Sequence, residues 1–401
     1  MTPPFPRISR RGALLGLGAA VALGRVSLAV AAAPTERRLV VVILRGALDG
    51  MAAVVPYGDP ALAALRPGLL PPQPGQESGV LDLGGFYGLH PALTGMHAMY
   101  AAGQLLPVHA VAGHVRTRSH FEAQDLMESG ADQRLSSGWL NRAVLAMAPR
   151  PLAGAPLSVG VALPLLLRGP ALVGAYAPTG FAQPQADLYA RLAAMHQSDP
   201  VTGPALRQGL AERGFTNAQL AGTQLAGAES PRDKYAFATL AGTAVRLLAA
   251  ADGPRIAAME LGGWDTHAGQ AQRLLGPLGQ LDAGLVAMRD GLGAAWAQTA
   301  VLVMTEFGRT ARANGTGGTD HGTGTVAFLA GGAVLGGRVL ADWPGLAEDR
   351  LLDGRDLAPT LDLRSLAKGL LASHLGLAAP ALLRAFPGSD AASPTAGLIR
   401  A

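Results

Sequence analysis

The sequence contains no cysteine among its 401 residues. Disulfide bonds and thiolate metal ligands are therefore excluded, and the fold must be held together by its core. Aromatic residues make up only 5% and charged residues only 15%, whereas hydrophobic residues reach 49%. This is the composition of a globular chain rather than a disordered one, and it is long enough for one large core or two domains.

The chain also lacks an excess of charge once its first 33 residues are set apart. The whole sequence has a formal net charge of +4, and residues 1–33 contain four arginines and no acidic residue. Residues 34–401 are therefore formally neutral. No run of basic residues interleaved with aromatic residues follows residue 33. We expect no nucleic-acid partner, because such binding depends on a basic surface.

The amino-terminal segment has the order of parts found in an export signal. Arg10 and Arg11 precede an apolar run, residues 12–24, which is too short to span a bilayer because a span takes roughly 20 apolar residues. Ala29-Val30-Ala31 supplies the small residues of a cleavage site. We interpret residues 1–33 as a twin-arginine signal peptide and predict a periplasmic or secreted mature chain without a transmembrane span. The alternative is a chance Arg-Arg before an amphipathic helix.

Five apolar runs predict strands. Continuous runs rich in β-branched residues are typical of strands buried on both faces of a parallel sheet. The runs are residues 39–44, 104–112, 255–261, 299–304 and 325–330. Apolar residues at helical spacing cover 235–251 and 270–297, and strands alternating with helices predict an α/β fold with a mainly parallel sheet. We expect residues 34–401 to form one domain, with an insertion near 150–230 and a loose tail over 391–401.

Polar side chains gather where these predicted strands end, which is where ligands bind in α/β sheets. Asp265 and His267 follow the third strand two residues apart, so an extended backbone would direct both to one side. A carboxylate and an imidazole there suit a divalent cation or an acid–base pair. Loop hydrogen bonding and helix capping are the alternatives. Glu306, at the end of the fourth strand, is either a ligand or a partner of Arg309.

Two further segments carry candidate chemistry. Ser119 begins a predicted helix that runs to Glu128, a favourable place for a nucleophile or an anion contact. The alternative is a capping box with Glu122. The Gly/Thr-rich loop 314–319 precedes Asp320-His321, and its backbone N–H groups could approach an anion. It lacks the lysine and helix of a P-loop, so a surface turn is the alternative.

Together these motifs resemble the domain of unknown function 1501 family, whose members commonly carry a twin-arginine signal and have no established activity. The resemblance rests on residues 44–50, 55–59, 118–125, 138–142, 263–267, 305–310 and 318–322. The family is similar in turn to the alkaline phosphatase and sulfatase superfamily. That similarity implies a central, mostly parallel sheet with helices on both faces, and cleavage of phosphate or sulfate esters with divalent metals.

The resemblance and the strand-end loops together suggest roles for individual residues. The candidate metal ligands are Asp49, Asp265, His267, Glu306, Asp320 and His321. Ser119 would attack a small anionic ester while Arg118 or Arg309 neutralises charge in the transition state. Glu306-Phe307 stands where the superfamily has an Asp-His pair, and Asp49 comes five residues past its strand. One divalent metal, or none, is therefore expected rather than two.

Two functions follow from the sequence. The first is an exported metal-dependent hydrolase of phosphate or sulfate esters. The alternative is a non-catalytic periplasmic protein that binds a ligand or a protein partner on a degenerate alkaline-phosphatase-like fold.

Overall fold

The computed structural model describes residues 26–27, 36–147, 154–160, 162–176, 195–196, 199 and 236–400. Of the predicted signal peptide, only Val26 and Ser27 fall within this part, and the rest of residues 1–33 lies outside it. Within the described ranges, no helix has the length and apolar character needed to cross a membrane.

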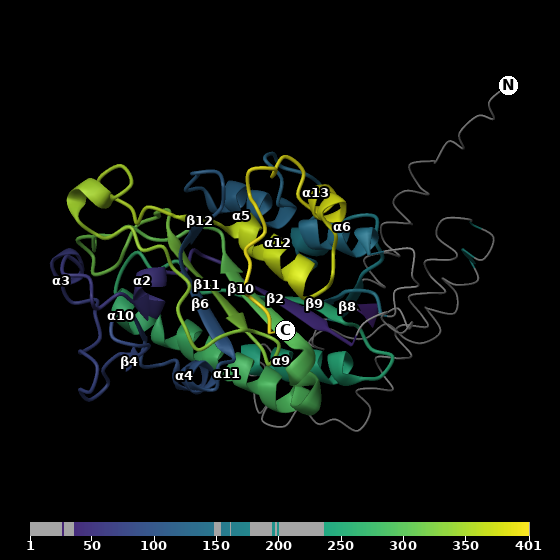
Figure 1. Ribbon diagram of the computed structural model, residues 1–401, viewed down its shortest axis with the longest axis horizontal. Coiled ribbons are helices and arrows are strands. Elements are labelled where there is room, and N and C mark those ends of the chain that lie inside the picture. Colours follow the sequence, from purple (N-terminus) through teal and green to yellow (C-terminus); the bar gives the residue numbers. More distant parts are fainter. Residues whose placement is uncertain are drawn as a thin grey trace.

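A nine-stranded sheet forms the centre of the molecule (Figure 1), in the order β1-β8-β7-β9-β2-β10-β11-β6-β12. Its strands are β1 Val26–Ser27, β2 Arg38–Leu44, β6 Leu105–Ala112, β7 Leu157–Val159, β8 Gly174–Tyr176, β9 Ile256–Leu261, β10 Thr299–Thr305, β11 Thr325–Ala330 and β12 Leu361–Asp362. All five strands predicted from the sequence are present, each within one residue of its expected ends. A separate sheet has the order β3-β5-β4, formed by Val54–Val55, Gly88–Leu89 and Leu81–Asp82.

The central sheet is mainly parallel, as predicted. β2 pairs in parallel with β9 and β10, and β9, β7 and β8 continue in the same direction. β11 is the exception within the core of the sheet, because it is antiparallel to both β10 and β6. Its connection from β10 contains no helix that could carry the chain back across the sheet, and adjacent antiparallel strands need no such crossover.

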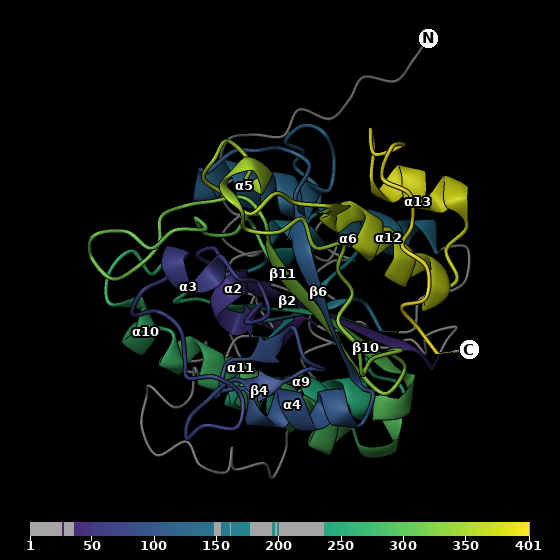
Figure 2. The same ribbon diagram turned by 60° about the vertical axis from the view of Figure 1, so that its left-hand side comes forward.

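Helices cover both faces of this sheet (Figures 1 and 2). They are α2 Gly50–Ala53, α3 Leu62–Leu65, α4 Thr94–Ala101, α5 His120–Ser129, α6 Trp139–Ala146, α9 Phe237–Ala249, α10 Gln270–Arg273, α11 Leu275–Leu292, α12 Leu363–Ser373 and α13 Ala379–Ala385. Short 3-10 helices are η1 Leu165–Leu167, η3 Gly293–Gln298 and η4 Glu348–Arg350.

The two core layers follow from the alternation of side chains along each strand. In β2, Val40, Val42 and Leu44 join a core with residues of α4, α9 and α11. The intervening Val41 and Ile43 join a second core with residues of α6, α12 and α13. A strand that is apolar on both faces therefore lies between two helical layers, as its continuous hydrophobic run indicates.

The structure bears on two expectations about chain organisation. Residues 157–176, at the start of the insertion predicted near 150–230, form β7, η1 and β8 and extend the central sheet. Most of the remaining range lies outside the described residues. The expected loose tail over 391–401 is wrong, because Leu398 is fully buried in the second core and Arg400 Nε donates to the Val334 carbonyl at 2.9 Å. Leu398 and Ile399 pack in the second core and hold this end of the chain against it.

Candidate metal centre

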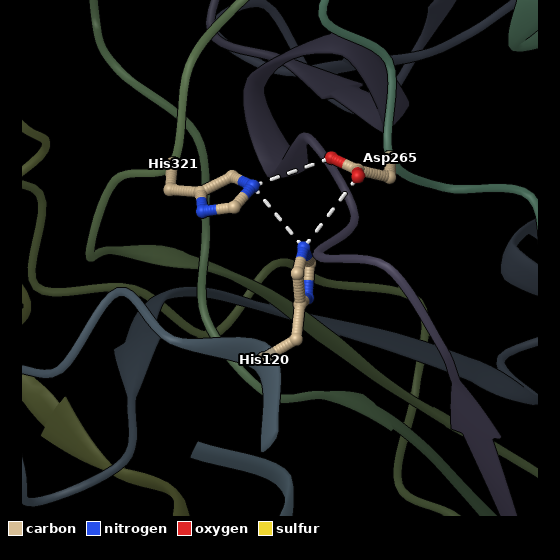
Figure 3. A group of neighbouring side chains, drawn as sticks. All are labelled: His120, Asp265 and His321. Carbon is tan, nitrogen blue, oxygen red and sulfur yellow. Dashed lines mark hydrogen bonds and ion pairs between the residues drawn. The ribbon is translucent and has the colours of Figure 1, made fainter. Parts of the chain in front are cut away.

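Four side chains meet beyond the carboxyl ends of the strands. His120 is the first residue of α5, which follows β6, and Asp265 and His267 lie in the loop after β9. His321 lies in the loop between β10 and β11. Figure 3 shows His120, Asp265 and His321 pointing toward one another, with donor atoms that all lie within 4.8 Å.

The donor atoms are spaced like the ligands of one ion. His321 Nε2 lies 3.1 Å from His120 Nε2 and 3.0 Å from His267 Nε2. Asp265 Oδ1 lies 3.0 Å from His267 Nε2 and 3.3 Å from His321 Nε2. A tetrahedral zinc ion with ordinary Zn–N bonds separates its nitrogen ligands by about 3.3 Å. His120, Asp265 and His321 therefore fit a single divalent cation, and His267 lies beside them.

The outer nitrogen of each imidazole contacts an oxygen acceptor. His120 Nδ1 lies 2.8 Å from Glu306 Oε1, His267 Nδ1 lies 3.1 Å from Asp320 Oδ1, and His321 Nδ1 lies 2.8 Å from the Arg118 carbonyl. Carbonyl and ionised carboxylate oxygens only accept hydrogen bonds, which assigns the proton to Nδ1 and leaves a lone pair on Nε2 of each neutral ring. The Nε2 atoms of His120 and His321 thus face one another and a carboxylate, while His267 Nε2 lies 3.0 Å from His321 Nε2 and 3.4 Å from Arg309 Nη1. This is the arrangement that orients metal-binding histidines.

Glu306 is buried and holds His120 rather than facing the centre. Its carboxylate also accepts hydrogen bonds from Gln124 Nε2, the Gly46 N–H and Thr305 Oγ1, each at 2.9 Å. Burial by itself would raise the pKa of Glu306, but the hydrogen bonds from His120 and Gln124 outweigh it and lower the pKa. The ionised Glu306 in turn raises the pKa of His120, mainly through their hydrogen bond.

Arg309 is fully buried beside Asp265. Its Nη2 donates to Asp265 Oδ1 at 2.5 Å, and the guanidinium also donates to backbone carbonyls of three loops. These acceptors belong to Gly46, Ala47, Trp264 and Thr319. Burial tends to raise the pKa of Asp265, but the hydrogen bond and charge of Arg309 outweigh it and lower the pKa. Arg309 therefore keeps Asp265 ionised and joins the loops around it.

Gly46 allows one close approach between these loops. Its φ is +117°, and a Cβ at this position would lie 2.7 Å from the Asp265 backbone nitrogen. A side chain here would push the two loops apart.

The structure separates the metal ligands predicted from the sequence into three groups. Asp265 and His321 lie in one cluster with His120, and His267 Nε2 lies 3.0 Å from His321 Nε2, whereas Glu306 and Asp320 each contact an imidazole Nδ1. Asp49 is fully buried, and its Oδ2 pairs with Arg66 Nη1 at 2.6 Å. His120, the remaining donor, was not predicted from the sequence as a ligand. The signal that could have indicated it is its position directly after Ser119, in one of the segments that resemble the family.

Ser119 is the N-cap residue of α5 and is exposed. The capping-box alternative is not present, because the Ser119 side chain makes no capping hydrogen bond and Glu122 Oε2 accepts instead from Thr117 Oγ1 at 2.7 Å. Arg118 is held by the buried Asp356, whose Oδ2 lies 2.7 Å from Arg118 Nη2. The hydroxyl is thus exposed, while the neighbouring guanidinium already has an anionic partner.

The Gly/Thr-rich loop 314–319 is held by hydrogen bonds between its own residues. Asn314 Oδ1 accepts hydrogen bonds from the N–H groups of Thr316 and Gly318, both at 3.0 Å. These two donors are therefore not directed at an external anion. Asn314 Nδ2 also donates to Asp320 Oδ1 at 3.1 Å, and this bond, together with that from His267, lowers the pKa of Asp320. The loop supports the centre from outside.

Comparison with known proteins matches this chain to a protein family that has no assigned reaction. The family profile described as "Protein of unknown function (DUF1501)" matches residues 106–383. The phosphonate monoester hydrolase of Agrobacterium radiobacter is 11% identical with a TM-score of 0.34, over 76% of this chain and 70% of that chain. The alkaline phosphatase from the Antarctic bacterium TAB5 is 13% identical with a TM-score of 0.29, over 77% of this chain and 92% of that chain. The comparison with curated proteins found no match. Similarity at this level leaves the reaction to be argued from the site.

Proposed function

The chain belongs to the DUF1501 family of proteins of unknown function, and we propose from its metal centre that it is an exported, metal-dependent hydrolase of phosphate or sulfate esters. One observation supports the metal dependence: the Nε2 atoms of His120 and His321 and the Asp265 carboxylate face one another, His267 Nε2 lies 3.0 Å from His321 Nε2, and an oxygen acceptor contacts each Nδ1. A donor set rich in imidazole favours zinc or iron over magnesium or calcium. The His120 side chain is 23% exposed and that of Asp265 48%, so the centre is open to a substrate.

Each residue of the centre has a separate task in this proposal. A divalent cation bound there would supply Lewis acidity to an ester oxygen. His120, His321 and Asp265 would hold it with His267 beside them, and Glu306 and Asp320 keep two of the rings in orientation.

Ser119 is the proposed nucleophile. Its exposed hydroxyl precedes His120 at the amino end of α5, a ten-residue helix. The first N–H groups of a helix have no intrahelical acceptor and favour an anion. Attack would form a bond from Ser119 Oγ to phosphorus or sulfur and release the alcohol, and water would then restore the serine.

Arg118 and Arg309 support the site rather than contact the ester in this account. Arg309 is fully buried with acceptors around its guanidinium, and Arg118 is held by Asp356. The same observation favours a second function, a non-catalytic metal-binding protein, because both arginines expected to neutralise the ester already have partners.

Metal analysis and an ester screen separate these two functions. We expect about one divalent metal per purified mature chain and turnover of an aryl phosphate or an aryl sulfate. Ser119→Ala should keep the metal and lose about 100-fold or more in turnover, whereas His120→Ala should lose the metal. His97→Gln is the matched control, because the His97 side chain hydrogen-bonds the Asp82 carbonyl at 3.0 Å on the surface. Metal without turnover supports the second function, and a metal-free, inactive protein contradicts the proposal.

A further inference from the structure

A second polar cluster lies buried beside the ligand-bearing loops. Its centre is Gln270, the first residue of α10, which is 1% exposed. The Gln270 Oε1 accepts hydrogen bonds from Thr266 Oγ1 at 3.0 Å and from Thr319 Oγ1 at 2.6 Å. Its Nε2 donates to Asp49 Oδ2 at 2.6 Å. Both the carbonyl oxygen and the amide nitrogen of the Gln270 side chain are therefore hydrogen-bonded inside the protein.

The two threonines belong to the two loops that carry the metal ligands. Thr266 lies between Asp265 and His267, and Thr319 directly precedes Asp320 and His321. Ligand atoms from these separate loops lie 3.0 Å apart between His267 and His321. The relative position of the loops therefore sets the spacing of the ligands, and Gln270 Oε1 contacts both loops.

Asp49 anchors this amide to the rest of the fold. Its Oδ2 is shared with Arg66 Nη1 at 2.6 Å, and both side chains are fully buried. Arg66 also donates to the carbonyls of Thr310 at 2.7 Å and Ala311 at 3.0 Å, directly after Arg309. The cluster thus connects the loop after β2 with the two ligand loops, which follow β9 and β10.

The contacts of Asp49 do not suit a metal ligand. They also do not suit a residue whose only effect is to stabilise the fold. Its charge is already matched by Arg66, and its Oδ1 is buried without a hydrogen-bond partner. A buried polar atom without a partner lowers the free energy of unfolding. A role at the neighbouring site explains why a carboxylate occupies this position.

We propose that Gln270, held by Asp49, is a positioning residue that fixes the two ligand loops at the spacing the metal requires. This inference rests on the proposed metal-dependent function. It assigns Asp49, expected from the sequence to bind metal, to the support of the loops instead.

The test compares Gln270→Leu with Gln104→Leu. Gln104 is a half-buried glutamine at the opposite, amino-terminal end of β6, where its Oε1 accepts from Trp296 Nε1 at 3.0 Å. Each mature protein is titrated with Co(II), in competition with Zn(II), and is unfolded in urea with EDTA. We expect Gln270→Leu to raise the Kd for Co(II) about tenfold or more and to change its visible spectrum. Gln104→Leu should leave both unchanged.

Two further measurements keep the inference testable. Amide hydrogen exchange in metal-free protein should accelerate over residues 264–270 and 314–321 in Gln270→Leu only. Thr319→Val removes one hydroxyl donor at similar volume and should raise the Kd, whereas Thr319→Ser keeps a hydroxyl and should restore it.

The outcomes distinguish this inference from the proposed function. Unchanged Kd values in Gln270→Leu and Thr319→Val overturn the positioning role while the metal centre stands. The positioning role is also overturned if Gln104→Leu raises the Kd for Co(II) as much as Gln270→Leu does while the two variants lose the same free energy of unfolding. If the wild-type protein binds no Co(II), the proposed metal-dependent function is wrong. The amide hydrogen-exchange rates alone then decide whether Gln270 links the two loops.

Discussion

The Nδ1 atom of His120 lies 2.8 Å from Oε1 of Glu306, the buried carboxylate at the end of β10. This contact sets the direction of the imidazole and places a lone pair on the opposite nitrogen, Nε2, which faces Asp265 and His321. The same carboxylate raises the pKa of His120. Glu306 therefore acts on the centre through the ring it holds.

Replacing Glu306 should weaken the centre without removing any of its donor atoms. We expect Glu306→Gln to raise the Kd for Zn(II) by roughly 10- to 100-fold, because ligand orientation is lost. The pKa of His120 in the metal-free protein should fall, since the negative charge is gone. Isothermal titration and NMR titration of the imidazole measure the two effects. Glu122→Gln on the same helix is the control, and equal behaviour of the two variants would exclude this role.

Arg309 should prove to be a residue of the fold rather than of the reaction. Arg309→Lys removes several donors from buried acceptors while keeping the charge. We expect the free energy of unfolding to fall by about 3 to 5 kcal/mol. Arg289→Lys is the control, because its partner Asp290 is exposed. Unchanged urea unfolding combined with lost turnover would instead point to a direct role in catalysis.

Acid should destabilise the metal-free protein through two buried histidines. His109 is 1% exposed and His90 is 8% exposed, and burial lowers the pKa of each to about 4. In the unfolded chain histidine titrates near pH 6.5, so below that pH the unfolded state binds more protons. Stability is then full above about pH 6.5 and falls as the pH drops toward 4, by up to about 3 kcal/mol per histidine.

Urea unfolding in EDTA between pH 7 and pH 4 measures this loss. Removing one buried imidazole in His109→Gln should flatten the profile, even though it lowers stability at pH 7. A wild-type profile that is flat over this interval would contradict the account.

Export depends on a segment mostly outside the described residues, and it remains a prediction. Substituting Arg10→Lys together with Arg11→Lys should abolish the periplasmic fraction in a host with the twin-arginine translocase. Arg7→Lys with Arg25→Lys is the matched control, because it changes the same residue type in the same segment without touching the pair. Fractionation followed by immunoblotting gives the result, and equal periplasmic amounts would count against the twin-arginine route.

The sequence predicted the strands because each is a continuous apolar run, and it placed Asp265, His267 and His321 in loops that do meet. It could not predict the direction of β11, since a strand buried on both faces has the same pattern in either direction. It also could not show that Arg66, 17 residues further along the chain, pairs with Asp49. The role of His120 depends on its contact with Glu306, 186 residues away. Such long-range pairings have no local signal.

The most direct test of the metal centre is anomalous diffraction from crystals of the mature protein grown with Zn(II). We predict one peak about 2.0 to 2.2 Å from the Nε2 atoms of His120 and His321 and from a carboxylate oxygen of Asp265. Density at Asp49, or no peak among these three side chains with zinc in the crystal, would contradict the account.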